Sequence, residues 1–159
     1  MLRPAGPSTE HLLTHHDGSR RTVYCTAREE PFPEGRLIVS RVDLAGVITH
    51  ANDSFVAMSG YSREELLGAP HSILRHPDMP RVAFADLWAT VAAGRKWHGY
   101  VKNLRKDGAF YWVYATVVPN VRQGLITGYT SVRRKPSRQR IEALAAQYAA
   151  WLREETPSP

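Results

Sequence analysis

The chain has 159 residues, a formal net charge of +6 and a single cysteine, Cys25. This length fits one domain with a substantial core, and a lone cysteine excludes an internal disulfide and any cysteine cluster for zinc or iron–sulfur. Because the sequence has no run of about 18 apolar residues and no secretory signal, we expect a soluble cytoplasmic domain without a membrane span.

The positive charge invites a comparison with nucleic-acid-binding proteins. The basic groups Arg20-Arg21, Arg133-Arg134-Lys135 and Arg138/Arg140 flank the expected core and do not share one helix face. No helix-turn-helix, zinc-finger or ribonucleoprotein aromatic motif is visible in the sequence. We therefore interpret these basic residues as solvated flanks and expect no nucleic-acid partner.

The N-terminal segment has the prolines, glycines and serines typical of loops, without a sustained hydrophobic period. We interpret residues 1–34 as a flexible arm with a short strand or helix around Arg21–Arg28. The globular domain is expected over residues 35–135. Its apolar runs Leu37–Val42 and Val47–Ala51 predict two strands joined by a turn.

Three helical patterns follow the second strand. Asn52 can cap a short helix, since its side-chain oxygen can accept from an N–H of the first turn. Ser62-Arg-Glu-Glu65 matches a capping box, in which the serine and glutamate side chains cap each other's backbone N–H groups. Apolar residues at helical spacing then predict a longer helix from Pro80 to Ala93.

From Trp97 onwards the hydrophobic pattern changes to a period of two, which is typical of strands. Residues 97–105 and 109–118 flank Lys106-Asp-Gly108, and Asp-Gly between two such runs is a strong hairpin signal. Residues 125–133 give a third strand. The predicted fold class is therefore α+β, with one antiparallel sheet and the helices on one of its faces.

The C-terminal part carries apolar residues at helical spacing, from Ile141 through Tyr148 to Leu152. This pattern predicts an amphipathic helix over residues 136–155, packed on the core or on a partner. The remaining residues, 156–159, have a composition typical of disorder, and we expect a disordered tail there.

Between the short helices and the longer one lies the segment His71-Ser-Ile-Leu-Arg-His-Pro-Asp-Met-Pro80. Its two prolines fix φ and lack an N–H, so we expect a rigid bend. Asp78 stands ahead of Pro80, as an N-terminal capping residue stands ahead of a proline in the first turn. The bend would hold Arg75 and His76 beside an apolar helix, where charged groups need partners in the protein or in a ligand.

Several motifs indicate the family that this chain resembles. Ala51-Asn-Asp-Ser-Phe55 and Lys106-Asp-Gly108 with Tyr111-Trp-Val113 are typical of PAS sensor domains. Arg75-His-Pro-Asp-Met-Pro80 is a narrower motif and resembles the FAD-binding PAS domain of bacterial aerotaxis receptors. The resemblance covers residues 37–134. It implies a PAS fold, in which a five-stranded antiparallel sheet and its helices enclose a ligand cleft.

The resemblance also implies a cofactor, FAD, and residues that hold it. The residues at matching positions are Asn52, Arg75, His76, Asp78, Trp88 and Asn103. It implies that Arg75, His76 and Asp78 are needed for flavin binding and that the other three lie near the flavin. No metal ligand and no catalytic residue is predicted.

The residues themselves leave a plainer interpretation open at each position. Asn103 shares its strand face with Val101, so its amide needs a partner, which is either the edge of a flavin ring or the backbone. Arg75 can clamp a pyrophosphate with its planar donors, or it can form a surface ion pair with Asp78 or Glu65.

The same holds for the histidines and the tryptophan. His76 can lie near the ribityl or phosphate groups, or it can be a structural histidine of the bend. Asp78 is more readily a helix cap than a ligand, and Trp88 is more often a core residue than a stacking partner of a cofactor. A haem would need an axial histidine, for which His71, His76 or His98 qualify by residue type alone.

These observations predict a redox or oxygen sensor in signal transduction of the aerotaxis type. An enzyme is not expected, because no nucleophile–base pair, carboxylate pair or metal signature appears. The alternatives are a cofactor-free PAS module that docks proteins and, ranked lower, a haem sensor. On the outer sheet face, Trp112 and Tyr114 are expected to form an exposed apolar patch for a homodimer or a downstream signalling protein, together with the terminal segments. We expect either a fragment of a longer receptor or a stand-alone sensor.

Overall fold

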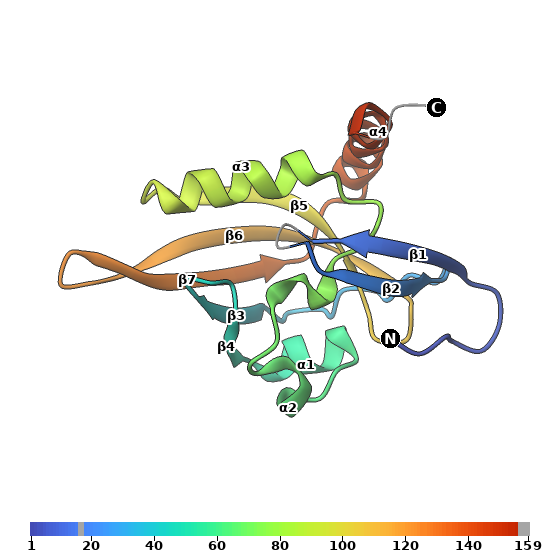
Figure 1. Cartoon of the computed structure of the whole chain (residues 1–159), viewed down its shortest axis with the longest axis horizontal. Helices are drawn as coiled ribbons and strands as arrows, with labels where there is room; N and C mark the ends of the chain where they lie inside the picture. Colours follow the sequence, from blue (N-terminus) through green and yellow to red (C-terminus); the bar gives the residue numbers. More distant parts are fainter. Residues whose placement is uncertain (16–17, 156–159) are drawn as a thin grey trace.

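The computed structural model describes residues 1–15 and 18–155. Its centre is a five-stranded antiparallel sheet with the strand order β4-β3-β7-β6-β5 (Figure 1). The strands are β3 (Ile38–Asp43), β4 (Ile48–Ala51), β5 (Trp97–Leu104), β6 (Phe110–Arg122) and β7 (Leu125–Arg134). The predicted α+β class with a five-stranded antiparallel sheet is confirmed. The tail predicted at residues 156–159 lies outside the described residues.

Helices fill the connections between β4 and β5 and the C-terminal part of the chain. They are α1 (Asp53–Ser59), α2 (Arg63–Leu66), the 3-10 helix η1 (His71–Leu74), α3 (Arg81–Ala92) and α4 (Arg138–Glu155). The Asn52 side chain caps α1 by accepting from the Phe55 N–H at 3.0 Å, and Ser62 and Glu65 form the capping box of α2. Both caps predicted from the sequence are therefore confirmed.

The inner face of the sheet is the one that packs against the short helices. Val113, Ala115 and Val117 of β6 lie on this face and are buried with Phe55 and Met58 of α1. Because side chains alternate along a strand, the other set of β6 residues lies on the outer face. The period of two that predicted this strand therefore also separates its two faces correctly.

In the N-terminal segment, the short strand or helix expected around Arg21–Arg28 is present as a strand, and the segment also contains a second strand that the sequence does not predict. The segment contains a hairpin of β1 (Thr9–Thr14) and β2 (Arg20–Cys25), which lies at the end of the molecule away from the β6–β7 turn (Figure 1). The small cluster that this hairpin buries consists of Leu13, Val23, Cys25 and Leu104. So few apolar residues in two short strands give no sustained hydrophobic period in the sequence.

Backbone hydrogen bonds fasten this segment to the β5–β6 turn. The Thr26 N–H donates to the Gly108 carbonyl at 2.8 Å, and the Phe110 N–H donates to the Arg28 carbonyl at 3.0 Å. A Cβ at Gly108 would lie 2.9 Å from the Tyr24 carbonyl oxygen, so glycine is required for this close approach. The hairpin is thus held against the sheet by its backbone as well as by its apolar side chains.

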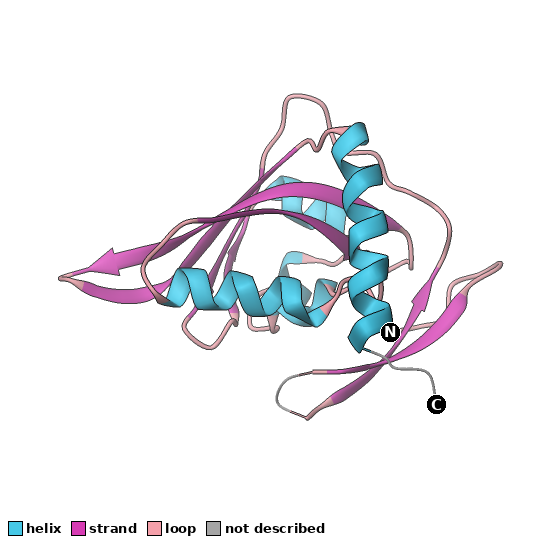
Figure 2. Cartoon of the chain, turned by 90° about the horizontal axis from the view of Figure 1, so that it is seen from above, coloured by secondary structure: helices cyan, strands magenta, loops and turns pink. Residues whose placement is uncertain are grey.

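The outer face of β5 and β6 packs against α4, which lies beside α3 and crosses it at a steep angle (Figure 2). The Tyr148 ring stacks on Trp112 with a centroid distance of 6.2 Å, and the Tyr148 hydroxyl donates to the Tyr100 carbonyl at 2.7 Å. The exposed patch expected at Trp112 and Tyr114 is therefore wrong, because Trp112 is only 6% exposed and Tyr114 is half-buried. The predicted amphipathic helix covers that face itself.

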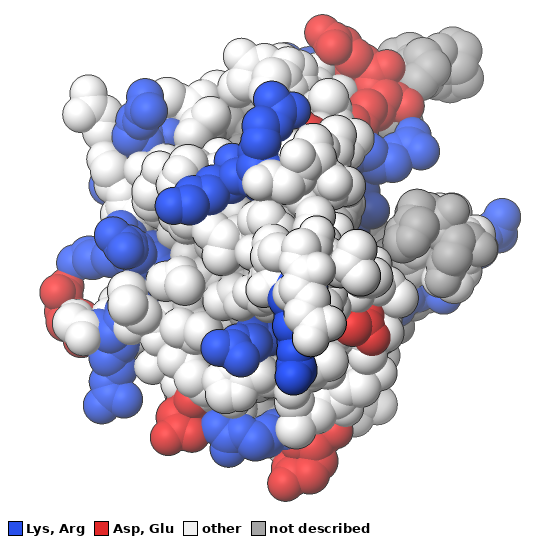
Figure 3. All heavy atoms as spheres, turned by 90° about the vertical axis from the view of Figure 1, so that its left-hand side faces the viewer, with Lys and Arg blue, Asp and Glu red and all other residues white. Residues whose placement is uncertain are grey.

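Charged side chains are distributed over the surface. At the end of the molecule that carries the β6–β7 turn, Lys and Arg side chains predominate over acidic ones, with uncharged residues between them (Figure 3). No helix in residues 1–15 and 18–155 combines the length and the apolar character needed to cross a membrane.

Candidate functional site

The Arg-His-Pro-Asp-Met-Pro motif lies along the edge of β5. Arg75 forms an antiparallel bridge with Asn103 of that strand. Lys102 donates its backbone N–H to Met79 Sδ at 3.3 Å and its ammonium group to the Asp78 carboxylate at 2.7 Å. The structure therefore brings the motif together with Asn103, although the two are far apart in the sequence.

His76 takes part in holding the bend. It is only 4% exposed, and its Nδ1 accepts from the Asp78 N–H at 3.0 Å. Burial lowers the pKa of His76 to about 4, and the nearby Lys102 acts in the same direction while Asp78 opposes it. The imidazole is therefore neutral at pH 7, and since Nδ1 is an acceptor, Nε2 carries the proton and is left as the donor.

Asp78 does not cap α3, which corrects the expectation from the sequence. The residue at the N-cap position is Pro80, and the N–H groups of Arg81 and Val82 instead donate to the Glu155 carboxylate of α4 at 3.0 Å each. Asp78 forms an ion pair with Lys102. Partial burial is the largest single influence on the Asp78 carboxyl and acts to raise its pKa. The hydrogen bond and charge of Lys102, together with other nearby groups, outweigh burial, so the pKa lies below its ordinary value.

Arg75 is half-buried, and its guanidinium lies 5.2 Å from the centroid of the Phe84 ring. The carboxylates considered as its surface partners are paired with lysines: Asp78 with Lys102, and Glu65 with Lys106. Burial lowers the pKa of Arg75, and the Glu155 carboxylate counteracts this effect. Arg75 thus lies at the junction of the motif and α3 without a salt bridge to either carboxylate that the sequence suggested.

Asn52 and Trp88 lie in other surroundings. The Asn52 oxygen accepts from the N–H groups of Val39 and Phe55, and its amide N–H donates to the Leu37 carbonyl, all at 3.0–3.1 Å. Trp88 is 39% exposed and meets the Tyr129 ring edge-on at 5.7 Å. These contacts join Asn52 to the start of β3 and Trp88 to β7, and do not place either residue against the motif.

A buried arginine on the inner face was missed in the interpretation of the sequence. The sequence places Arg133 within a basic flank that we expect to be solvated, but it is only 2% exposed. It lies on β7 opposite Ile38 and Ala115, both of which face the core. The sequence does contain a signal for this position: Arg133 is an even number of residues from the apolar Tyr129 on the same strand, so the two side chains lie on the same face.

The partners of the Arg133 guanidinium are neutral. One amino group donates to Ser40 Oγ at 2.6 Å, and the other lies 3.2 Å from His71 Nε2. The group also lies 4.6 Å from the centroid of the Phe55 ring. Burial lowers the pKa of Arg133 to about 10, and burial together with this arginine lowers the pKa of His71 to about 3. Arg133 therefore remains a cation, held by neutral groups in the interior.

Tyr111 lies in the same region of the inner face. It pairs with Asn103 in the β5–β6 register, and both side chains are buried. Burial raises the pKa of Tyr111 to about 12, while the positive charge of Arg133 and the neighbouring Asn103 side chain act in the opposite direction. Tyr111 is therefore a neutral phenol at pH 7.

Three buried polar atoms lack a hydrogen-bond partner within the part of the chain that the structure describes: Tyr111 Oη and Arg133 Nε on the inner face, and Arg75 Nε beside Phe84 of α3. We call them the open polar atoms. A buried polar group left unpaired costs about 1–3 kcal/mol, so such groups need an explanation. Two are arginine donors that require acceptors, and the third is a hydroxyl that can donate or accept. A flavin with its ring carbonyls and phosphates offers acceptors for all three, so the residues present fit this cofactor.

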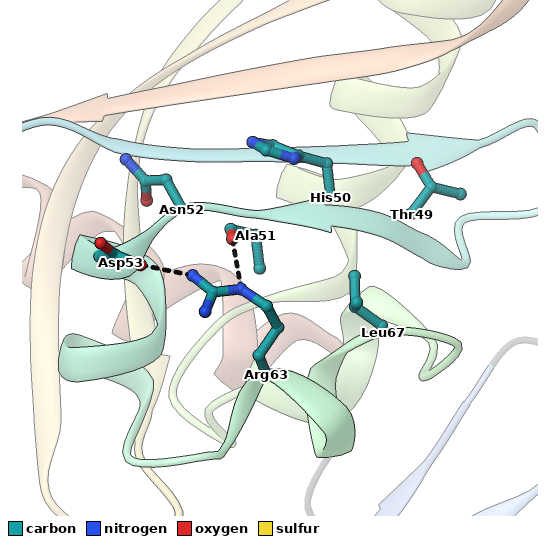
Figure 4. A pocket seen from close by; sticks show the side chains of 7 residues that line it. All are labelled: Thr49, His50, Ala51, Asn52, Asp53, Arg63 and Leu67. Carbon is teal, nitrogen blue, oxygen red and sulfur yellow. Dashed lines mark hydrogen bonds and ion pairs between the residues drawn. The ribbon is translucent and has the colours of Figure 1, made fainter.

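Two surface hollows lie outside this region. One of about 330 Å³ lies beside β4 and α2, where Arg63 already donates to the Ala51 carbonyl and to Asp53 (Figure 4). The other, of about 1030 Å³, is lined by the first residues of the chain, the α1–α2 connection and the β5–β6 turn, and its Lys106 is paired with Glu65. The charged groups named in these two hollows already have partners in the protein, and none of the open polar atoms lines either hollow. The open polar atoms therefore indicate a ligand site elsewhere.

Comparisons with known proteins show which family and which proteins this chain is similar to. The family model described as "PAS fold" matches residues 48–133. The aerotaxis receptor of Escherichia coli K12 is 48% identical over 127 residues, which are 80% of this chain and 25% of that protein. The nitrogen fixation regulatory protein of Klebsiella pneumoniae is 28% identical over 102 residues, 64% of this chain and 21% of that protein. The chain thus spans about a quarter or less of these relatives.

Solved structures agree with the fold. A PAS domain from Colwellia psychrerythraea superposes with a TM-score of 0.58 at 26% identity and covers 63% of this chain and 86% of its own. The light-state structure of the blue-light photoreceptor Aureochrome1 LOV gives a TM-score of 0.61 at 23% identity, with 70% and 88% covered. At this level of identity the second likeness concerns the fold alone.

Proposed function

Because the chain belongs to the PAS family, we propose that it is a redox or oxygen sensor domain that binds FAD between the inner sheet face and the short helices. The observation that carries the proposal is the set of open polar atoms on Arg75, Tyr111 and Arg133. The identity of 48% to a protein named an aerotaxis receptor supports the same class of signal.

A bound flavin supplies two-electron redox chemistry, in which uptake of two electrons and one proton leaves one additional negative charge on its ring. The chain contributes a buried cation, Arg133, to the region where we place that ring. Arg75 offers guanidinium donors to the phosphates, and His76 offers its Nε2 proton. Asp78 acts indirectly, by holding Lys102 and the bend in place.

Two amides of the predicted site have different surroundings, and we propose different roles for them. Asn52 is held by three hydrogen bonds to backbone groups, so it stays fixed and supports the wall of the cleft. Asn103 lies beside the Tyr111 hydroxyl, and its amide can reverse its donor and acceptor ends when the ring charge changes. A role of Trp88 at the flavin remains a prediction.

The other candidate functions have less support. For a haem, His71 would have to turn its Nε2 from the Arg133 guanidinium to an iron cation, and His98 lies exposed on the outer face, hydrogen-bonded to Thr116. A cofactor-free docking module leaves the open polar atoms unexplained. For a downstream partner or a second copy of the chain, we propose the terminal segments, since Trp112 is covered.

The test is an absorption spectrum of the purified protein, followed by heat release and chromatography of the pigment. We expect the bands of an oxidised flavin, their loss with dithionite, and recovery of FAD. Arg75→Leu is expected to lose the pigment, whereas the control Arg81→Leu, at a more exposed arginine, is expected to keep it. A strong Soret band would assign a haem. A colourless protein that does not take up added FAD would leave the docking module.

A further inference from the structure

One end of the molecule presents exposed apolar side chains. Among the described residues, Leu125 and Val121 of the β6–β7 turn are 71% and 62% exposed, and Leu44 of the β3–β4 turn is 62% exposed. Trp88 is partly exposed and lies against the same β3–β4 turn, about 4 Å from the position of a Cβ on Gly46. We call Leu44, Trp88, Val121 and Leu125 the apolar tip.

The β6–β7 turn is tight and projects outward. Arg122 pairs with Leu125, so the loop consists of Gln123 and Gly124, with φ values of 52° and 77°. Two positive φ values are typical of a type I′ turn, whose twist matches that of the adjoining strands. The turn extends past β3 and forms the outermost point at this end of the molecule (Figure 1). Val121 and Leu125 are therefore presented on a well-defined hairpin.

Basic residues accompany the apolar tip. Arg122 lies in the turn itself, and Arg95 and Lys96 are exposed just after α3. The C-terminal end of α3 lies at the same end of the molecule (Figure 1). Two carboxylates of the neighbouring elements are occupied within the protein. Asp43 accepts two backbone N–H groups of its own turn, and Asp86 accepts from an indole N–H. The surface around the tip is therefore suited to an anionic partner.

The shape distinguishes between the possible anionic partners. A stable protein–protein contact buries about 800 Å² on each side, which is more than a projecting two-residue turn provides. A bilayer surface accepts a few apolar side chains between its headgroups and attracts basic residues near its anionic lipids. We propose that the apolar tip, with Arg95, Lys96 and Arg122, is a peripheral docking surface for an anionic lipid bilayer. This proposal does not require a flavin in the cleft, but it uses Trp88 as a surface residue and therefore competes with a role of Trp88 beside the flavin.

The test is sedimentation of the full chain with vesicles of phosphatidylcholine, with and without phosphatidylglycerol. The protein is expected to sediment with the anionic vesicles only, and less at high salt because salt screens the attraction. Leu125→Ser is expected to lower the partition coefficient about tenfold, and Arg122→Gln about fivefold. The matched controls Leu12→Ser and Arg20→Gln lie at exposed positions of the β1–β2 hairpin and are expected to bind like the unchanged protein.

Tryptophan fluorescence tests which end of the molecule contacts the bilayer, because Trp88 belongs to the apolar tip. On binding anionic vesicles the emission is expected to move to shorter wavelength, and Trp88→Phe is expected to remove most of this change. The proposal is overturned if the protein sediments with neither kind of vesicle, or if Leu12→Ser weakens binding as much as Leu125→Ser. A dimer that forms without vesicles and depends on Leu125 also overturns it, because the tip would then be an interface between copies of this chain.

Discussion

The two faces of the β5–β6 hairpin come from the same strands but differ in how completely their polar groups are hydrogen-bonded. On the outer face, Trp112 stacks on Tyr148, and the Tyr148 hydroxyl donates to the Tyr100 carbonyl. On the inner face, Tyr111 Oη and the nearby Arg133 Nε lack hydrogen-bond partners within the described part of the chain. An aromatic face that is packed and hydrogen-bonded serves stability, whereas a face with open polar atoms has donors and acceptors left over, as the proposed flavin site requires.

The largest expected effect comes from breaking the packed face. Trp112→Ala removes a buried ring from under α4 and is expected to lower the free energy of unfolding by about 3–5 kcal/mol. Urea denaturation measures this loss. The neighbouring Tyr114→Ala, at a half-buried position, should cost clearly less. Equal effects of the two substitutions would contradict the packing of α4 on Trp112.

The two buried histidines, His71 and His76, give a pH dependence. The folded-state pKa values of His71 and His76 are about 3 and about 4, below the ordinary value of 6.5, because burial favours their neutral forms. At pH values between the folded-state pKa of each histidine and 6.5, the unfolded chain binds more protons than the folded one. Stability is therefore fully present above pH 6.5 and falls as the pH drops towards 4, by about 1.4 kcal/mol per pH unit for each histidine.

Urea denaturation as a function of pH tests this expectation. His76→Gln is expected to reduce the slope of stability against pH in that window. His50→Gln, at an exposed position of β4, is expected to leave the slope unchanged. An unchanged slope in His76→Gln would mean that this histidine is not buried in its neutral form.

A substitution on the inner face is expected to affect stability in the opposite direction to Trp112→Ala on the outer face. Arg133→Met removes a buried cation whose partners among the described residues are the neutral Ser40 and His71. The FAD-free protein should therefore keep or gain stability, while FAD affinity should fall by about 1–3 kcal/mol. Thermal unfolding and FAD titration measure the two quantities. Arg134→Met, the next residue on β7 and exposed, is the matched control and should change neither. A stability loss without any change in affinity would assign Arg133 a structural role only.

The smallest effect concerns the contact between α4 and α3. Glu155 accepts the N–H groups of Arg81 and Val82 at the start of α3, and a side-chain cap of this kind contributes about 1 kcal/mol. Glu155→Gln and Glu155→Ala are expected to lower stability by this amount or less in urea denaturation. Glu154→Ala, at the neighbouring exposed position, is the control. Equal losses at the two positions would argue against a cap.

Local patterns in the sequence predicted most of the fold. The period of two along β6 assigned its two faces, and the capping motifs at Asn52 and Ser62 located the starts of α1 and α2. These features depend on neighbouring residues, so one sequence is enough to reveal them. For the β1–β2 hairpin the sequence indicated only a short strand or helix near β2 and not its pairing with β1, because the buried cluster takes too few apolar residues from each strand.

The errors at the site have a common cause, which is contact between distant segments. Trp112 was expected to be exposed, because nothing in its own strand shows that α4 returns to cover it. Asp78 was expected to cap α3, but Glu155 does so from 73 or 74 positions away, while Asp78 pairs with Lys102. Arg133 looked like part of a charged flank, because the strand end that turns it inward merges in the sequence with the basic residues Arg134 and Lys135.

The most direct test of the flavin site is the unfolding midpoint of the FAD-free protein with and without added FAD. A ligand that binds only the folded state raises this midpoint, and the rise grows with its concentration and affinity. We expect FAD to raise it in the unchanged protein and in Arg134→Met, and to raise it less in Arg133→Met. If saturating FAD leaves the midpoint of the unchanged protein where it was, the inner face is not a flavin site and the proposed sensor function is wrong.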